Sequence, residues 1–137
     1  MPAPRIEKAI GPAKRELAKA LRAYNIAAAG KADYRPFVLT FREKGRIVGG
    51  LYAELYWGWM YVNLLWVSEE HRGKGLGRAL MQRAEAEASK HGVRNAFLES
   101  FSFQAPRFYK KLGYREFGRV NDFPKGHSRH WMTKNLK

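Results

Sequence analysis

The segment from Glu69 to Arg78, EEHRGKGLGR, holds the residues whose types and spacing are best suited to chemistry. Glycines occupy positions 73, 75 and 77, and basic side chains occupy positions 72, 74 and 78. Glycines leave backbone amides open to a ligand, and amides at the start of a helix lack partners and lie at the positive end of the helix dipole. Such a segment can bind a diphosphate, and the basic side chains add positive charge.

Other glycine-rich loops use the same physics but need different spacings. A P-loop requires a serine or threonine directly after Gly-Lys, whereas here Gly75 follows that pair. A dinucleotide-binding loop requires G-x-G-x-x-G early in a βαβ unit, whereas this chain has G-x-G-x-G after an expected antiparallel meander. A turn with only a structural role would not need glycines and cations together. The spacing that fits is R-x-x-G-x-G, formed by Arg72, Gly75 and Gly77.

The glycine-rich segment must lie between a strand and a helix for its amides to act in this way. Residues 60–67, MYVNLLWV, are almost all apolar, which predicts a central strand buried on both faces. Apolar residues recur at intervals of four over residues 76–91, which predicts an amphipathic helix that ends at Gly92. A strand follows at residues 95–99, and the helical crossover before it predicts a parallel pairing.

The rest of the chain supplies the remaining elements of an α/β domain. An apolar stripe over residues 5–29 predicts a helix that ends at Gly30, with Gly11-Pro12 dividing off a short first turn. Further patterns predict strands at 37–41, 47–56, 114–120 and 130–135, and a second helix at 105–112. We therefore expect one domain over residues 1–137, built around a mixed sheet.

Two motifs together resemble the GCN5-related N-acetyltransferase (GNAT) family. Residues 64–80, LLWVSEEHRGKGLGRAL, are similar to the strand, diphosphate-binding loop and helix of that family. Residues 107–114, RFYKKLGY, resemble its second hallmark, F-Y-x-K-x-G-[FY]. The resemblance covers nearly the whole chain. It implies a mostly antiparallel central sheet with a splayed parallel pair, flanked by helices.

The resemblance also implies an N-acetyltransferase that uses acetyl-CoA as co-substrate and needs no metal. In the family, loop amides bind the coenzyme A diphosphate, and exposed backbone of the preceding strand binds the pantetheine arm and the acetyl carbonyl. Carried over to this chain, the cofactor-binding residues are Leu65, Trp66, Val67, Arg72, Gly73, Lys74, Gly75, Leu76, Gly77 and Arg78. Many relatives carry a cofactor-contacting asparagine where this chain has Ser102, and Gln104 is the candidate to replace it.

Tyr109 corresponds to the tyrosine that protonates the departing thiolate in the family. A phenol with a pKa of about 10 can give a proton to a thiolate of similar basicity, and direct attack by an amine needs no acyl-enzyme. The base stays open among Glu54, Glu99 and His127, of which Glu54 is the residue we expect. Asn63 lies where a carboxylate would be useful, but an amide cannot act as a base.

Aromatic residues gather in the two strands expected before the loop. They are Tyr52, Tyr56, Trp57, Trp59, Tyr61 and Trp66. Alternate residues of a strand face opposite sides of a sheet, so some of these rings belong to the core and others line an acceptor pocket. Aromatic rings suit a flat or cationic amine. We expect the acceptor to be an amine of a small molecule or a peptide.

The composition sets wider bounds on the protein. Its 137 residues carry a net charge of +14 and include no cysteine, which excludes disulfides, thiolate metal sites and a cysteine nucleophile. No apolar run reaches the roughly 18 residues of a membrane helix, and the N-terminus lacks the apolar core of a signal peptide. We expect a cytoplasmic protein without a membrane partner. The charge alone would also fit a nucleic-acid-binding module, but the sequence contains no nucleic-acid-binding motif. Dimers are common in the family that the sequence resembles, so a homodimer is possible.

Overall fold

The computed structural model describes residues 2–137, which divide into two compact units on either side of the Ala32–Asp33 bond. The first unit contains helix α1 (Ile10–Ala29), which has no buried residue. The prediction of a helix over residues 5–29 was wrong for residues 5–9, because Pro12 sits in the first turn, where proline is tolerated. Gly30 ends the helix as expected, with a φ of +84° and its N–H bonded to the Ile26 carbonyl. The expectation of a single domain stays a prediction.

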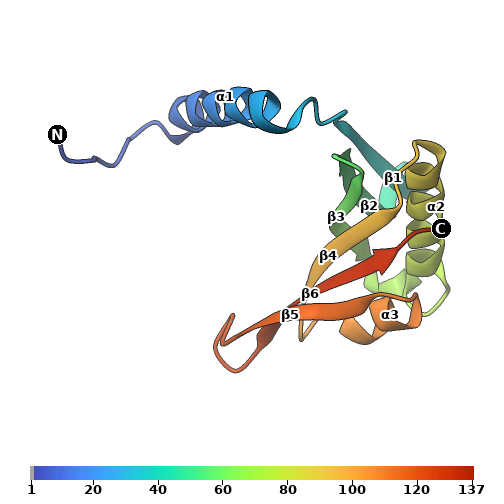
Figure 1. The fold of residues 1–137 in the computed structure, drawn as a ribbon. Coiled ribbons are helices and arrows are strands. Elements are labelled where there is room, and N and C mark those ends of the chain that lie inside the picture. The colour runs from blue at the N-terminus through green and yellow to red at the C-terminus, as the bar shows by residue number, and fades with distance from the viewer. Residues whose placement is uncertain (1) are drawn as a thin grey trace. The chain divides into compact units, whose positions relative to one another are not determined.

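The second unit is a mixed sheet with helices, as the sequence predicted (Figure 1). Its strands are β1 (Arg35–Glu43), β2 (Arg46–Tyr56), β3 (Trp59–Val67), β4 (Asn95–Phe101), β5 (Arg115–Asn121) and β6 (Ser128–Asn135). They form a 6-stranded sheet in the order β1-β2-β3-β4-β6-β5, in which β3 and β4 pair in parallel and all other neighbours pair antiparallel. The 3₁₀ helix η1 (Glu69–His71) and helices α2 (Leu76–Lys90) and α3 (Pro106–Lys111) complete it.

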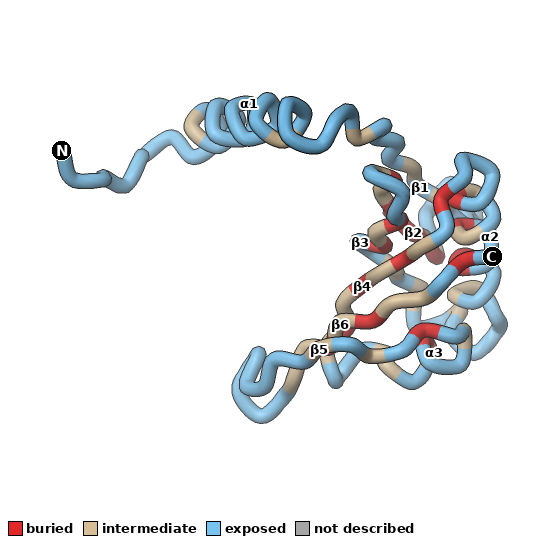
Figure 2. Tube along the Cα trace, in the orientation of Figure 1, coloured by how far each residue is buried: buried red, intermediate tan, exposed pale blue. Residues whose placement is uncertain are grey.

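The hydrophobic core lies between one face of the sheet and the helices α2 and α3. Strand β2 shows the pattern, because Leu51, Ala53 and Leu55 are buried while the residues between them are not. Figure 2 shows buried positions, in red, on the strands and on α3, and none on α1. Helix α2 contributes Leu80, Met81, Ala84 and Ala88. Burying a large aliphatic side chain contributes roughly 1.5–3 kcal/mol, so this layer is the main stabilising element of the unit.

The opposite face of the sheet, here called the open face, carries neither α2 nor α3. The prediction that residues 60–67 are buried on both faces was therefore wrong. Met60 and Val62 are buried in the core, whereas Leu64 is 62% exposed and Trp66 is 51% exposed. The aromatic cluster follows the same division. Tyr52, Tyr56 and Tyr61 are half-buried, Trp57 and Trp59 are exposed, and none of the six rings belongs to the buried core.

Strands β3 and β4 separate along their length. Their parallel pairing runs from Trp59↔Asn95 to Val62↔Leu98 and stops there, although both strands continue. At the same place a bulge interrupts the pairing of β2 with β3, which shifts the register at Asn63. The edge of β3 beyond Val62 that faces β4 therefore has no strand partner. This is the splayed pair that the resemblance implied.

No helix within residues 2–137 is both long and apolar enough to span a bilayer.

The buried tyrosines of the core predict a loss of stability at alkaline pH. Burial raises the pKa of Tyr109 to about 12 and raises that of Tyr114 as well, where Glu85 adds to the effect. The unfolded chain ionises near pH 10, so stability is complete below that pH and falls as the pH rises toward the folded pKa. We expect each tyrosine to cost about 1 kcal/mol in the free energy of unfolding between pH 9 and pH 11.

Urea denaturation at several pH values measures this loss. The Tyr109→Phe/Tyr114→Phe double variant is the control, because it keeps the lysines that titrate in the same range. The expectation fails if parent and double variant lose stability equally between pH 9 and pH 11.

Candidate active site

The glycine-rich loop connects β3 to α2 through backbone conformations that favour glycine. Gly73 has a φ of +75° and Gly75 has a φ of +85°, both in the left-handed region. A Cβ built on either residue would meet no atom within 4 Å, so the space above them is free. Both glycines are therefore needed for the path of the backbone, and they leave its surface accessible.

The backbone amides of this loop form the main feature of the site. Within the described residues, none of the N–H groups from Gly73 to Arg78 has a hydrogen-bond partner. The Arg72 N–H differs from the sequence expectation, because it donates to the Glu69 carbonyl at 3.3 Å. The N–H of Ala79 begins the helical ladder by donating to the Gly75 carbonyl at 3.0 Å. The unpaired donors thus lie together at the N-terminus of α2, where an anion is favoured.

Three contacts hold the loop in place against the sheet. The Ser68 N–H donates to the Val48 carbonyl at 2.8 Å. The His71 ring bridges the Ser68 hydroxyl at 2.6 Å and the Glu43 carboxylate at 3.0 Å. The Arg72 Nε donates to the Val67 carbonyl at 3.0 Å. The loop is therefore preorganised rather than dependent on a ligand for its shape.

The third glycine has a different role from the first two. A Cβ on Gly77 would lie 3.2 Å from the Phe108 ring on α3, which is closer than an ordinary contact. Gly77 thus allows α2 and α3 to approach, and it brings the two sequence motifs together. A glycine is needed at this position of the motif for helix packing, which the spacing of the motif did not reveal.

The basic side chains of the loop are available to a ligand. Arg72, Lys74 and Arg78 are exposed, and none forms an ion pair with an acidic side chain in the described part of the chain. Charge therefore gathers beside the unpaired amides without being neutralised. Among the strand residues assigned to the cofactor, Leu65 and Val67 pack against the core, whereas Trp66 is turned to the open face.

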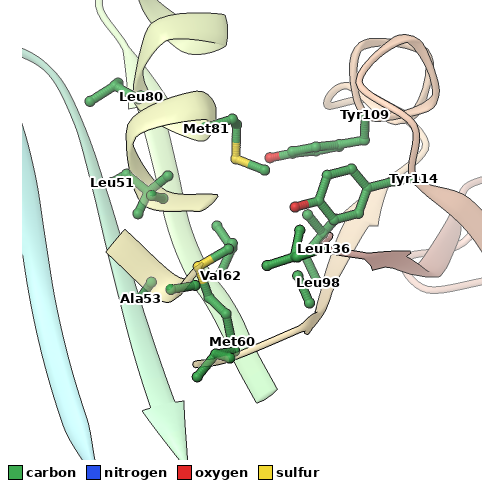
Figure 3. Packing of buried hydrophobic residues seen from close by; sticks show 14 of the residues in the cluster. Leu51, Ala53, Met60, Val62, Leu80, Met81, Leu98, Tyr109, Tyr114 and Leu136 are labelled. Atoms are coloured by element: carbon green, nitrogen blue, oxygen red, sulfur yellow. The ribbon is translucent and has the colours of Figure 1, made fainter. Parts of the chain in front are cut away.

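Tyr109 lies on α3 and is only 8% exposed. Figure 3 shows its ring beside Tyr114, with the hydroxyl pointing toward Met81 on α2. Burial raises its pKa to about 12, so the phenol keeps its proton at any physiological pH. No group within residues 2–137 forms a hydrogen bond with this hydroxyl, whereas that of Tyr114 donates to Glu85 at 2.9 Å. The Tyr109 O–H is thus a donor without a partner inside the protein.

The candidate bases differ in their surroundings. Glu54 lies on the open face, and one of its oxygens accepts a hydrogen bond from the Tyr34 hydroxyl at 2.5 Å. Glu99 lies on the same face but is paired with Arg129 at 2.8 Å. His127 lies in the β5–β6 connection, with its ring 3.4 Å from the Ser102 hydroxyl. Of these three groups, only Glu54 lies outside the β5–β6 turn and forms no ion pair with a described residue.

Gln104 is held in a local turn. Its side-chain oxygen accepts the Phe101 N–H at 2.8 Å, and its own N–H donates to the Phe101 carbonyl at 2.9 Å. The residue as a whole is exposed. The residue therefore shapes the connection between β4 and α3.

Sequence reasoning missed two residues that shape the open face. Tyr34, just before β1, reaches Glu54 through the antiparallel register of β1 and β2, which a single sequence does not reveal. Arg129 on β6 lies over the rings of Phe101, Phe123 and Trp131 at 5.0–5.2 Å. The sequence signal for Arg129 was its position in β6, because alternate strand residues face opposite sides of the sheet and its neighbour His130 is buried.

The comparisons with known proteins agree with this geometry. The sequence model of the Acetyltransferase (GNAT) family matches residues 5–114, and the chain belongs to this family of acetyltransferases. It is 42% identical to the blasticidin-S acetyltransferase of Streptomyces morookaense over 95 residues, which are 69% of this chain and 70% of that protein.

Solved structures show the same fold. The crystal structure of an acetyltransferase from Bacillus cereus matches with a TM-score of 0.87 and 36% identity, covering 97% of this chain and 98% of that one. An aminoglycoside 6′-N-acetyltransferase complexed with coenzyme A matches with a TM-score of 0.67 and 17% identity, covering 98% and 96%. The second likeness concerns the fold alone.

Because the loop amides have no partner, we expect a negative charge at position 75 to prevent binding of coenzyme A. Gly75→Glu places a carboxylate among the unpaired donors, whereas Gly75→Gln places a neutral side chain of the same size there. Both variants pay the same cost of about 1 kcal/mol for a side chain in the left-handed region. We expect Gly75→Glu to abolish measurable binding of coenzyme A and Gly75→Gln to weaken it less.

Isothermal calorimetry with coenzyme A measures both affinities, and circular dichroism confirms that each variant is folded. Equal affinities of the two variants would show that the amides and cations of the loop do not bind the diphosphate.

Proposed function

We propose that this protein is an acetyl-CoA-dependent N-acetyltransferase that transfers the acetyl group directly to the amine of a small molecule. The observation that carries the proposal is the run of N–H groups from Gly73 to Arg78 that have no partner within residues 2–137. Beside them lie Arg72, Lys74 and Arg78, which form no ion pair with the described acids. An anion with several oxygens would satisfy these donors, and the diphosphate of coenzyme A is such an anion. Acetyl-CoA supplies the thioester that is cleaved.

The proposed cofactor site extends from the loop along β3. The amides of residues 73–78 and the side chains of Arg72, Lys74 and Arg78 bind the diphosphate. The edge of β3 at Leu65, Trp66 and Val67, which has no strand partner, offers backbone groups to the pantetheine arm. The Val67 carbonyl already accepts the Arg72 side chain, so its N–H is the group that remains. Gln104 contributes its side-chain amide from the β4–α3 connection.

Tyr109 is the proposed general acid. Its pKa of about 12 keeps the proton on the phenol, and its hydroxyl lacks a partner inside the protein. As the carbon–sulfur bond breaks, Tyr109 gives its proton to the sulfur and then regains one from solvent. The benefit is a neutral thiol in place of a buried thiolate.

Glu54 is the proposed base. The acceptor arrives as an ammonium ion and loses one proton to Glu54, which leaves a lone pair to form the new carbon–nitrogen bond. The nitrogen loses a second proton to solvent as the amide forms, while the sulfur gains one from Tyr109, which solvent replaces. One proton is thus released to solvent for each amide made, and Glu54 carries it there.

A small-molecule acceptor is favoured by the name of a related protein. The relative with 42% identity is named a blasticidin-S acetyltransferase, and blasticidin S is a small molecule. A peptide amine is the alternative acceptor.

We further propose that residues 1–137 act as one domain in the cytoplasm, where a chain without cysteine is suited to a reducing environment. Whether it acts as a homodimer is a question for size-exclusion chromatography with light scattering.

The role of Tyr109 can be separated from its place in the core. Tyr109→Phe removes only the hydroxyl and keeps the ring, so coenzyme A binding should be unchanged. Turnover should fall roughly 10²-fold, because the thiolate then leaves without a proton donor. Release of free thiol from acetyl-CoA, measured over a panel of amines, gives both kcat and the acceptor.

Tyr114→Phe is the matched control, because Tyr114 is an equally buried tyrosine whose hydroxyl bonds to Glu85 instead. It should lose stability but keep its kcat. Equal kcat values for Tyr109→Phe and the parent enzyme would remove Tyr109 from the reaction.

A further inference from the structure

The ion pairs of the acidic side chains distinguish the two carboxylates of the open face, Glu54 and Glu99. The protein has 26 lysines and arginines against 12 aspartates and glutamates. Glu85, Glu87, Glu99 and Glu116 all form ion pairs. Within residues 2–137, no basic side chain pairs with Glu54. The fold thus keeps one carboxylate of the open face without a cation.

Tyrosines surround this carboxylate. The Tyr34 hydroxyl donates to one carboxylate oxygen at 2.5 Å, and the Tyr52 hydroxyl lies 3.5 Å from that of Tyr34. Tyr56 is two residues from Glu54 on the same face of β2. Burial raises the pKa of Tyr56, and the negative charges of Glu54 and Glu99 raise it further. The second oxygen of Glu54 has no bonding partner among these groups.

The neighbouring acid on the open face shows the opposite arrangement. Glu99 accepts hydrogen bonds from Tyr61 and from Arg129, both at 2.8 Å. The Arg129 guanidinium lies over three aromatic rings, so this part of the face already contains its own cation in an aromatic setting. The two acids have similar surroundings of aromatic rings and hydroxyls. They differ in that the cation beside Glu54 is missing.

We propose that Glu54, with Tyr34, Tyr52 and Tyr56, forms an ammonium-binding box that selects small acceptors by an alkylammonium group. This proposal rests on the proposed function and adds the chemical class of its acceptor. An alkylammonium is protonated at neutral pH, as lysine is, and it carries N–H donors for the free carboxylate oxygen and the tyrosine hydroxyls. Aromatic rings favour such a cation further. A neutral molecule of the same shape gains none of these interactions.

Benzylamine and benzyl alcohol provide a matched test of this box. The two have nearly the same size and shape, and only benzylamine is a cation at pH 7. Calorimetry in the presence of coenzyme A, without an acetyl group, measures binding and prevents turnover. We expect benzylamine to bind at least tenfold more tightly than benzyl alcohol.

Two variants of the box and one control locate the effect. Glu54→Gln should remove most of the preference for benzylamine, and Tyr34→Phe should reduce it several-fold because the carboxylate loses its fixed position. Glu87→Gln is the control, because it removes one negative charge on α2 while leaving the open face intact. It should keep the full preference. Coenzyme A affinity, measured in every variant, confirms that each protein is folded.

The outcomes separate this proposal from the function on which it rests. Equal binding of benzylamine and benzyl alcohol to the parent protein would overturn the ammonium-binding box. So would an unchanged preference in Glu54→Gln when coenzyme A still binds. If coenzyme A itself fails to bind, or no amine in the panel is acetylated, the proposed function fails instead.

Discussion

The backbone amides of residues 73–78 impose the constraint on which the rest of the structure depends. Backbone N–H groups almost always have a partner, and a run without one is stable only while water or a ligand supplies acceptors. Left-handed conformations at Gly73 and Gly75 make this run, and contacts from Ser68, His71 and Arg72 fix it to the sheet. Gly73, Lys74, Gly75 and Arg78 are exposed, so water can bond to their donors until an anion replaces it.

The packing of α2 and α3 depends on the same glycine-rich loop. Gly77 lets α2 approach Phe108, so both helices pack on one face of the sheet and bury Tyr109 between them. The other face receives no helix from this unit and presents aromatic rings with two carboxylates. The proposed acceptor residues lie on the open face, whereas Tyr109 lies on the core face, and β3 and β4 diverge beyond Val62. That gap is where an acetyl group can face an amine.

The sequence predicted much of this arrangement, and its failures have physical causes. The order of helices and strands along the chain, the parallel pair and the glycine-rich loop follow from local patterns that the fold does not override. The sequence did not predict the exposure of Leu64 and Trp66, because an apolar run looks the same whether helices cover one face of the sheet or both. The contact between Tyr34 and Glu54 depends on the register of two strands. The packing role of Gly77 depends on a residue 31 positions later.

The account is tested most directly by nuclear magnetic resonance of the ¹⁵N-labelled protein as coenzyme A is added. If the account is correct, the amide signals of residues 73–78 shift most strongly and move downfield, as donors do when they gain an acceptor. The amides of α2 beyond Ala79, which are already bonded, should move little. Saturating binding that leaves the signals of residues 73–78 in place, with the largest shifts elsewhere, would contradict it.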